Sequence, residues 1–281
     1  MIQKKPKVSV LTPLYNTNPQ HLRECIESIL NQTFTDFEFI ILNDSPENKE
    51  LDKIVKSYKD KRIKYFKNDK NMGISAARNK LLDMARGEYV AIFDHDDISM
   101  PDRLEQEVKF LDDNPHIGVV SGWIECFGFF EVTRNTPKHD FEIKVALTDN
   151  CVVCHTAAMI RKSILSDNGI KYEECYTPAE DYCLWARLMD ITHFYNIQAV
   201  LVKYRTYPTQ TSVNQDYKMS IVRRAIYTEI RDKHPYLYKE FLESAHRTRF
   251  RVRLFGVPLL KIKNNWVYLF ECIPLFCIRW R

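Results

Sequence analysis

Three carboxylates lie within four residues at Asp94-His95-Asp96-Asp97. Carboxylates this close repel one another, so a fold that needed nothing at this place would be more stable without them. A divalent cation removes the conflict, because Mg²⁺ or Mn²⁺ takes one or two carboxylates and fills its other positions with water and phosphate oxygens. The spacing therefore predicts a metal site that faces a diphosphate. By itself the pattern is a weak signal, since Asp97 or Asp102 would also serve as a helix cap.

Apolar runs of strand length precede this cluster and three other polar segments. The runs are residues 8–11, 37–42, 63–66 and 89–93, and helical periodicity fills the stretches 19–31, 47–59 and 74–85 between them. Strands that alternate with helices predict right-handed crossovers and an α/β fold with a mostly parallel, doubly wound sheet covered on both faces. Ligands bind beyond the carboxyl ends of such strands. The polar segments 12–16, 43–45, 68–73 and 94–97 are therefore expected to meet at one edge.

The second half of the chain is less regular. Helices are expected at 103–112 and 180–189, strands at 118–121 and 199–202, and a largely helical extension at 216–246. The 281 residues include only seven glycines, and neither G-x-G-x-x-G nor G-x-x-x-x-G-K-[ST] occurs. This argues against dinucleotide-binding and P-loop functions.

The net charge of +4 is unevenly distributed. Residues 247–281 hold eight Lys or Arg and one Glu, so this basic amphipathic tail carries +7 and the rest of the chain −3. That distribution argues against a general nucleic-acid binder and favours an anionic partner for the tail. Pro258 and Pro274 interrupt the two similar halves of the tail, and neither half offers the run of roughly 20 apolar residues that spans a bilayer.

We expect the tail to attach peripherally to the anionic inner face of the plasma membrane. The alternative is that residues 247–281 fold back as the last helices of the domain. The amino terminus has no apolar stretch of signal-peptide length, so we expect a cytoplasmic protein with reduced cysteines. Cys151-Val152-Val153-Cys154-His155 matches a haem-attachment pattern, but that chemistry needs an exported protein. We expect these cysteines to be small buried hydrophobic residues in a strand.

Five segments of the first hundred residues occur in a fixed order: Val8–Asn16, Ser28–Thr33, Phe39–Ser45, Asn71–Asn79 and Asp94–Asp97. Two more follow, Ala179–Trp185 and Tyr204–Ser212. Together they resemble the family 2 glycosyltransferases of GT-A fold over roughly residues 6–215. The resemblance implies a catalytic domain at 1–215, with its nucleotide-binding half at about 1–100 and its acceptor half at about 101–215.

The resemblance implies a UDP-sugar donor. Pro13 and Tyr15 match the loop around the uracil, where an aromatic ring stacks on a base. Asp44 matches the carboxylate that accepts the uracil imide N–H, although the family more often has two acidic residues here and this chain has Asn43 first. The segment near the phosphates is matched by Asn71, Arg78 and Asn79. Simpler interpretations are an exposed loop aromatic for Tyr15 and a cation paired with a nearby acid for Arg78.

The same resemblance assigns the acidic cluster. Asp94 and Asp96 match the ribose and metal contacts, with Asp97 in support, and the ion is Mn²⁺ or Mg²⁺. Where the family often carries a histidine two residues after the arginine of its C-terminal signature, this chain has Tyr207. The third protein ligand of the ion is therefore not identified, and His95 on the donor side is a weak substitute.

The implied reaction is an inverting transfer of a hexosyl or N-acetylhexosaminyl group. The acceptor is a hydroxyl of a glycan or lipid-linked saccharide in cell-surface polysaccharide assembly. The metal and Arg78 stabilise the departing diphosphate while a carboxylate deprotonates the acceptor. We assign that base to Asp181, with Glu180 binding the acceptor or orienting the base. The alternative is that both acids favour a helix N-terminus through its dipole. His155 resembles a polar residue near the acceptor, and a satisfied buried histidine is equally consistent with the sequence.

Two other functions use a similar sheet. A sugar nucleotidyltransferase normally has a Gly-rich phosphate loop after its first strand, and Thr12–Tyr15 is not one. A membrane-associated scaffold that binds sugar nucleotides without turnover would have no need of Asp181.

Overall fold

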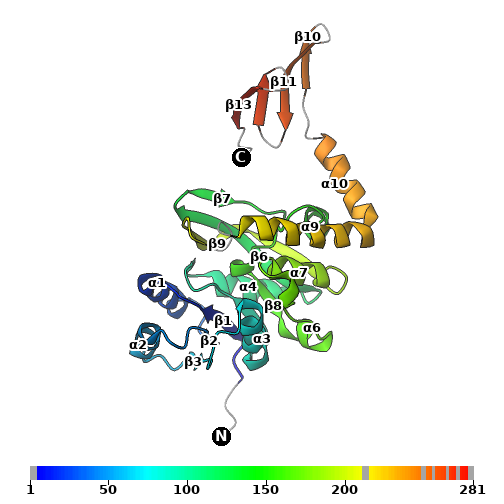
Figure 1. Cartoon of the computed structure of the whole chain (residues 1–281). Helices are drawn as coiled ribbons and strands as arrows, with labels where there is room; N and C mark the ends of the chain where they lie inside the picture. The colour runs from blue at the N-terminus through cyan, green and yellow to red at the C-terminus, as the bar shows by residue number, and fades with distance from the viewer. Residues whose placement is uncertain are drawn as a thin grey trace. The chain divides into compact units, whose positions relative to one another are not determined.

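The computed structural model describes residues 5–210, 215–247, 251–254, 257–263, 266–269 and 273–277. The chain divides into two compact units, Met1–Glu229 and Ile230–Arg281. The first unit contains a mixed sheet whose strand order is β3-β2-β1-β4-β8-β6-β9-β5 (Figure 1).

The first half of this sheet is parallel, as the sequence predicts. It consists of β1 (Val8–Leu14), β2 (Phe37–Asn43), β3 (Ile63–Lys67) and β4 (Tyr89–Ile92). The connecting helices are α1 (Pro19–Leu30), α2 (Lys49–Ser57) and α3 (Ile74–Met84). Every residue of β1 and β2 is buried, which explains why apolar residues such as Val10-Leu11 and Ile40-Ile41-Leu42 stand next to one another instead of alternating with polar residues.

Side chains of β1 pack on both faces of the sheet. Val8 and Val10 belong to the main core together with Leu22 of α1. Leu11 instead lies beside Leu81 of α3. The expected coverage of both faces is therefore confirmed.

Local capping sets where the helices begin. The Asn18 side chain accepts hydrogen bonds from the backbone N–H groups of Gln20 and His21 at the start of α1, and Asn48 caps α2 in the same way. No side chain caps α3; it begins after Gly73, whose φ of 84° is a conformation that side chains disfavour.

The second half of the sheet is mostly antiparallel, which the sequence did not indicate. β4 and β6 (Ile117–Gly128) both pair antiparallel with β8 (Met159–Arg161), whereas β6 runs parallel to β9 (His193–Thr206). Two short strands, β5 (Ile98–Ser99) and β7 (Val132–Arg134), pair antiparallel with β9 and β6.

The helices of this half are α4 (Arg103–Asp113), α5 (Asp140–Leu147), α6 (Lys162–Asp167) and α7 (Glu180–Leu188), with 3₁₀ turns η1 (His155–Ala157) and η2 (Glu174–Tyr176). The predicted helices at 103–112 and 180–189 are thus confirmed. Cys151 and Cys154 lie half-buried in the loop before η1, so their placement in a strand was wrong. The cysteines among the described side chains are free thiols.

A buried ion pair fixes α4 against the end of β4. Arg103 and Glu107 are fully buried, and Arg103 Nε donates to Glu107 Oε2 at 3.1 Å. Arg103 Nη2 also donates to the carbonyl oxygen of Ile92 at 3.0 Å. Removing one partner of such a pair costs about 3–5 kcal/mol, because it leaves an uncompensated charge in the core. The hydrogen bond from Arg103 therefore fixes the backbone just before the acidic cluster.

The C-terminal region begins with helices and continues as strands. α9 (Asp216–Lys233) and α10 (Pro235–Arg247) are helices within the range where the sequence predicted a helical extension. They are followed by a four-stranded antiparallel sheet of β10 (Arg251–Leu254), β11 (Val257–Lys263), β12 (Trp266–Leu269) and β13 (Ile273–Cys277). The alternative of last helices is thus wrong for these segments, because proline disfavours helix interiors and β-branched and aromatic residues favour strands. Within the ranges given above, no helix has both the length and the apolar composition for a membrane crossing.

Candidate active site

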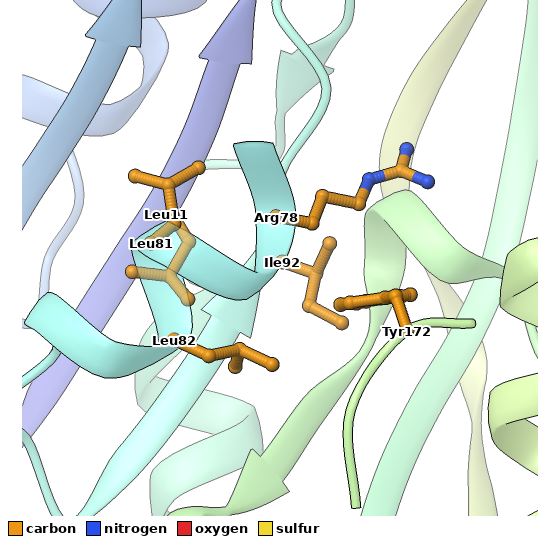
Figure 2. A pocket seen from close by; sticks show the side chains of 6 residues that line it. All are labelled: Leu11, Arg78, Leu81, Leu82, Ile92 and Tyr172. Carbon is orange, nitrogen blue, oxygen red and sulfur yellow. The ribbon is translucent and has the colours of Figure 1, made fainter. Parts of the chain in front are cut away.

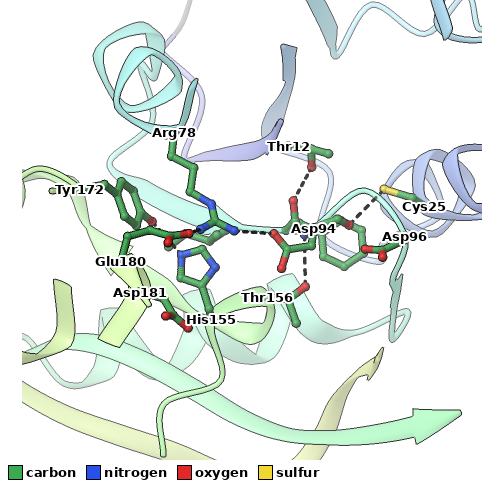
Figure 3. A network of polar contacts seen from close by, with 12 residues as sticks. Thr12, Cys25, Arg78, Asp94, Asp96, His155, Thr156, Tyr172, Glu180 and Asp181 are labelled. Atoms are coloured by element: carbon green, nitrogen blue, oxygen red, sulfur yellow. Dashed lines mark hydrogen bonds and ion pairs between the residues drawn. The ribbon is translucent and has the colours of Figure 1, made fainter. Parts of the chain in front are cut away.

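The acidic cluster follows β4 directly, at the carboxyl edge of the parallel strands. Thr12 Oγ1 of β1 donates to the Phe93 carbonyl oxygen at 2.8 Å, and the Asp94 N–H donates to Thr156 Oγ1 at 3.2 Å. Neighbouring elements on both sides therefore fix the backbone of the cluster (Figure 3).

The three carboxylates of the cluster have different partners. Asp97 is fully buried, and its Oδ1 accepts a hydrogen bond from the Arg205 N–H at 2.9 Å. Burial, with Asp96 and Asp94 nearby, raises the pKa of Asp97 well above its usual range.

In the described part of the chain, no three His, Cys, Asp or Glu side chains converge on one cation position. Asp97 thus supports the loop from inside the protein, whereas Asp94 and Asp96 are half-buried.

Arg78 joins the cluster to the predicted acceptor residues. Its Nη2 donates to Asp94 Oδ1 at 3.0 Å, and its Nη1 donates to Glu180 Oε1 at 2.5 Å. Burial lowers the pKa of Arg78, but the two carboxylates raise it above its ordinary value, so the guanidinium stays charged. The sequence placed Arg78 near the phosphates and Glu180 beside the acceptor, and the structure brings them into contact (Figure 3).

An apolar wall supports the aliphatic part of Arg78. A small cavity there is lined by Leu11, Arg78, Leu81, Leu82, Ile92 and Tyr172 (Figure 2). The guanidinium carbon lies 5.6 Å from the centre of the Tyr172 ring. The stem is therefore packed against hydrocarbon while the charged end projects toward the carboxylates.

Asp181 lies next to this bridge, in the first turn of α7. Its Oδ1 accepts a hydrogen bond from the Tyr182 N–H at 2.8 Å, as a carboxylate that stabilises a helix N-terminus does. Burial raises the pKa of Asp181, although Arg78 opposes the shift. Burial also raises the pKa of Glu180, again against the effect of Arg78. A carboxylate with a raised pKa is a stronger base, so both interpretations of Asp181 remain compatible with its surroundings.

His155 is a satisfied buried histidine. Its Nε2 is 2.9 Å from the Tyr172 hydroxyl. Burial, and then Arg78, lower the pKa of His155 to about 3, so the ring is neutral at physiological pH. This confirms the simpler of the two sequence interpretations.

Tyr172 is a residue that the sequence did not reveal. Asn79 donates to its carbonyl oxygen and accepts from its N–H, both at 2.8 Å. The segment around Tyr172 has no motif that would have drawn attention to it. Asn79, predicted near the phosphates, thus holds this segment against α3.

The predicted nucleotide end forms a second hydrogen-bonded group. Asp44 is buried, and its carboxylate accepts from Asn68 Nδ2 at 2.7 Å and from the N–H groups of Met72 and Gly73 at 2.9 and 3.1 Å. Asn71 Oδ1 accepts from the same Gly73 N–H at 2.8 Å. Asp44 therefore shapes the loop before α3, and its contact with uracil stays a prediction.

The neighbouring loop presents an aromatic ring. Tyr15 is 52% exposed, whereas Pro13 is buried in β1. Asn16 follows with a φ of 47°, and its N–H donates to Ser45 Oγ at 2.8 Å. The ring of Tyr15 is thus exposed beside this turn, and its stacking on a base stays a prediction.

Asn43 has a physical reason to be an amide here. Its Nδ2 donates to Asp52 Oδ1 at 3.3 Å and to the Tyr65 hydroxyl at 3.1 Å. An aspartate at this position would repel Asp52 and lose both donors. The departure from the family pattern thus follows from this neighbourhood.

Arg205 and Tyr207, which lie in the segment that matches the family's C-terminal signature, contact the acidic cluster. Arg205 Nε donates to the Asp96 carbonyl oxygen at 2.8 Å, and its guanidinium pairs with Glu24. The Tyr207 hydroxyl donates to Asp96 Oδ2 at 2.7 Å. Burial, and then Asp96, raise the pKa of Tyr207, which keeps the phenol protonated as a donor. The other predicted residue here, His95, has its Nδ1 buried without a hydrogen-bond partner among the described residues.

The family model for glycosyl transferase family 2 matches residues 9–169. The chain belongs to glycosyltransferase family 2. An uncharacterized glycosyltransferase of Methanocaldococcus jannaschii is 39% identical over 211 residues, which are 72% of this chain and 71% of the relative. The putative glycosyltransferase EpsE of Bacillus subtilis is 33% identical over 205 residues, 71% of this chain and 73% of EpsE.

Solved glycosyltransferase structures have the same fold. S. aureus TarS 1-349 in complex with UDP-GlcNAc gives a TM-score of 0.67 at 22% identity, covering 86% of this chain and 73% of the TarS chain. The mannosyltransferase PcManGT from Pyrobaculum calidifontis, in complex with GDP-Man and Mn²⁺, gives 0.60 at 16% identity, covering 90% and 78%. The predicted GT-A fold of this family 2 glycosyltransferase is thereby confirmed.

Proposed function

We propose that this glycosyltransferase moves a hexosyl or N-acetylhexosaminyl group from a UDP-sugar to a hydroxyl of a glycan or lipid-linked saccharide, with inversion. The observation that carries the proposal is the bridge from Asp94 through Arg78 to Glu180 (Figure 3). It joins a donor-side carboxylate cluster to a helix start that bears Asp181. A displacement with inversion needs a leaving-group site and a base on opposite sides of the sugar, and these two groups are the candidates.

The proposed donor is a uridine nucleotide. Asp44 supports this choice as a buried carboxylate at the nucleotide end, and Tyr15 as an exposed ring able to stack on a base. Among the structures with this fold, TarS is in complex with UDP-GlcNAc and PcManGT with GDP-Man. A direct comparison of nucleotide-sugars is therefore needed to identify the donor's nucleotide.

A divalent cation fits the donor set of the cluster. Asp96 Oδ2 accepts a hydrogen bond from the Tyr207 hydroxyl, and Asp96 Oδ1 has no hydrogen-bond partner among the described residues. Carboxylate, phosphate and water oxygens are the ligands that Mg²⁺ and Mn²⁺ prefer. When bound, such an ion would stabilise the negative charge that develops on the diphosphate.

The protein's own groups would act as follows. The carboxylate of Asp181 takes the proton of the acceptor hydroxyl, whose oxygen bonds to the anomeric carbon. The bond from that carbon to the diphosphate breaks, and its electron pair leaves with UDP. Arg78 retains N–H groups beyond the two used for Asp94 and Glu180, so it can donate to the departing phosphate. Glu180 keeps Arg78 beside Asp181.

A panel of nucleotide-sugars tests the donor assignment. UDP-sugars with Mn²⁺ should raise the melting temperature more than GDP-, ADP- or CDP-sugars, because Asp44 and Tyr15 select the base. The shift should shrink when Mn²⁺ is omitted. Equal stabilisation by every nucleotide, with or without metal, would contradict the proposal.

The substitution Asp181→Asn tests the base. Transfer should fall by roughly 10²–10⁴-fold, the usual contribution of a general base, while donor binding measured by calorimetry is kept. Asp167→Asn, an exposed acid at the end of α6, is the matched control. Wild-type rates in Asp181→Asn would refute the assignment. Donor binding without any transfer by the wild-type chain would favour the scaffold alternative.

The pH profile of the same reaction follows from Asp181. A base must be ionised to act, and the pKa of Asp181 is raised from its ordinary value of 3.8. Activity should therefore be lost on the acid side, with a midpoint above that value, as pH falls through the raised pKa. This acid limb should be absent from the residual activity of Asp181→Asn.

We place the chain in the cytoplasm, peripherally on the inner face of the plasma membrane. The support is the charge of +7 on residues 247–281 and the aromatic residues among them. The full chain should sediment with anionic liposomes and remain in solution with zwitterionic ones. A chain that ends at His246 should lose this binding, and unchanged sedimentation would rule out the role of the tail.

A further inference from the structure

α9 carries an arginine on the face that packs against the protein. Met219 is 7% exposed and Ile226 1% exposed, so these two residues mark the packed face of the helix. Residues three or four positions apart share a helix face, and Arg223 lies four residues after Met219 and three before Ile226. The side chain of Arg223 is nevertheless exposed. The packed face of α9 is therefore interrupted by a charged group that meets solvent.

Two hydrogen bonds fix α9 beside α7. The Tyr176 hydroxyl donates to Glu229 Oε1 at 2.5 Å, and Arg187 Nη1 donates to Glu229 Oε2 at 3.2 Å. Six residues before this last pair, the two helices carry Asp181 and Arg223, about 9 Å back along each axis. The anchored end of α9 is thus near the helix that bears the proposed base.

The charge of Arg223 acts on Asp181 itself. Burial raises the pKa of Asp181, and the positive charges of Arg78 and Arg223 oppose the shift. Burial and then the charge of Asp181 raise the pKa of Cys151, and Arg223 again opposes the shift. Because interactions between charges weaken with distance, Arg223, Asp181 and Cys151 lie close together. Asp181 and Cys151 are only half-buried, so solvent reaches this group.

The guanidinium of Arg223 is available to a ligand. It makes no hydrogen bond or ion pair with the residues that the structure describes. Asp181, its nearest named acid, already accepts from the Tyr182 N–H. A guanidinium offers five N–H donors in a planar fork that matches a carboxylate or a phosphate. An anionic group that arrives beside Asp181 would therefore find its partner in Arg223.

We propose that Arg223 binds an anionic group of the acceptor saccharide, a phosphate or a carboxylate, beside the hydroxyl that Asp181 deprotonates. The proposal rests on the transfer reaction and the base put forward above. It adds that the acceptor carries a negative charge near its reactive hydroxyl. Arg223 thus selects the acceptor and takes no part in donor binding.

The test compares three related sugars: neutral glucose, glucose 6-phosphate and glucuronate. Their affinities for the full chain are measured by saturation-transfer NMR, with saturating UDP and Mg²⁺ so that the donor site is filled. The wild type should bind at least one charged sugar about tenfold more tightly than glucose, as expected for one hydrogen bond between charged groups. The charged sugar that binds more tightly identifies the anion as phosphate or carboxylate. A wild type without this preference, including one that binds none of the three sugars, would overturn the proposal.

Arg223→Gln should abolish the preference and leave the affinity for glucose unchanged, because it removes only the charge. Arg224→Gln is the matched control, since Arg224 is an exposed arginine of the same helix that lies off the face of Met219 and Ile226. The control should keep the wild-type preference. A preference that survives in Arg223→Gln, or an equal loss in both variants, would contradict the assignment.

UDP binding separates this proposal from the proposed function. Arg223→Gln should keep the wild-type affinity for UDP, which shows that the variant is folded. If the wild type binds no UDP, the proposed transfer reaction itself fails. That result differs from a wild type that binds UDP and shows no preference for the charged sugars.

Discussion

The guanidinium of Arg78 lies between two carboxylates that come from positions 16 and 102 residues away. Glu180 is buried and Asp94 is half-buried, and together the two carboxylates compensate the charge of the buried arginine and hold it in position. The charges of the triad sum to −1. Without Arg78, Asp94 and Glu180 would face each other as like charges beside Asp97 and Asp181. The neighbouring acids of this region are therefore compatible with a folded chain because this bridge exists.

The rest of the fold supports the bridge from several directions. α3 provides Arg78 and an apolar wall for its stem, and Tyr172 closes the wall. Arg103 donates a hydrogen bond to the carbonyl oxygen of Ile92, at the end of the strand that precedes the cluster. Arg205, at the end of β9, donates hydrogen bonds to the Asp97 carboxylate and to the Asp96 carbonyl oxygen. Strands from both halves of the sheet thus converge on one short loop, as expected for an α/β sheet whose site lies at the carboxyl edge.

Local sequence patterns predicted a large part of this. The apolar runs predicted β1 to β4, of which β1 and β2 are buried along their whole length, and the acidic cluster lies at the carboxyl edge that these strands predicted. The antiparallel pairing of β8 and the long β6–β9 pair were not predicted, since strand partners depend on tertiary packing rather than on local composition. The contact of Arg78 with Glu180 and that of Tyr207 with Asp96 were missed for the same reason. Each joins residues that lie more than a hundred positions apart. His155 and Asn43 became interpretable only through their neighbours Tyr172 and Asp52.

The most direct test of the account is a double-mutant cycle of Asp94→Asn and Glu180→Gln, with the free energy of UDP-sugar binding measured by calorimetry. If Arg78 couples the two sides of the site, the two substitutions should be non-additive by about 0.5–3 kcal/mol, as for residues of one ion-pair network. The coupling should vanish when the cycle is repeated with Arg78→Met. Additivity within about 0.5 kcal/mol in the presence of Arg78 would contradict the account.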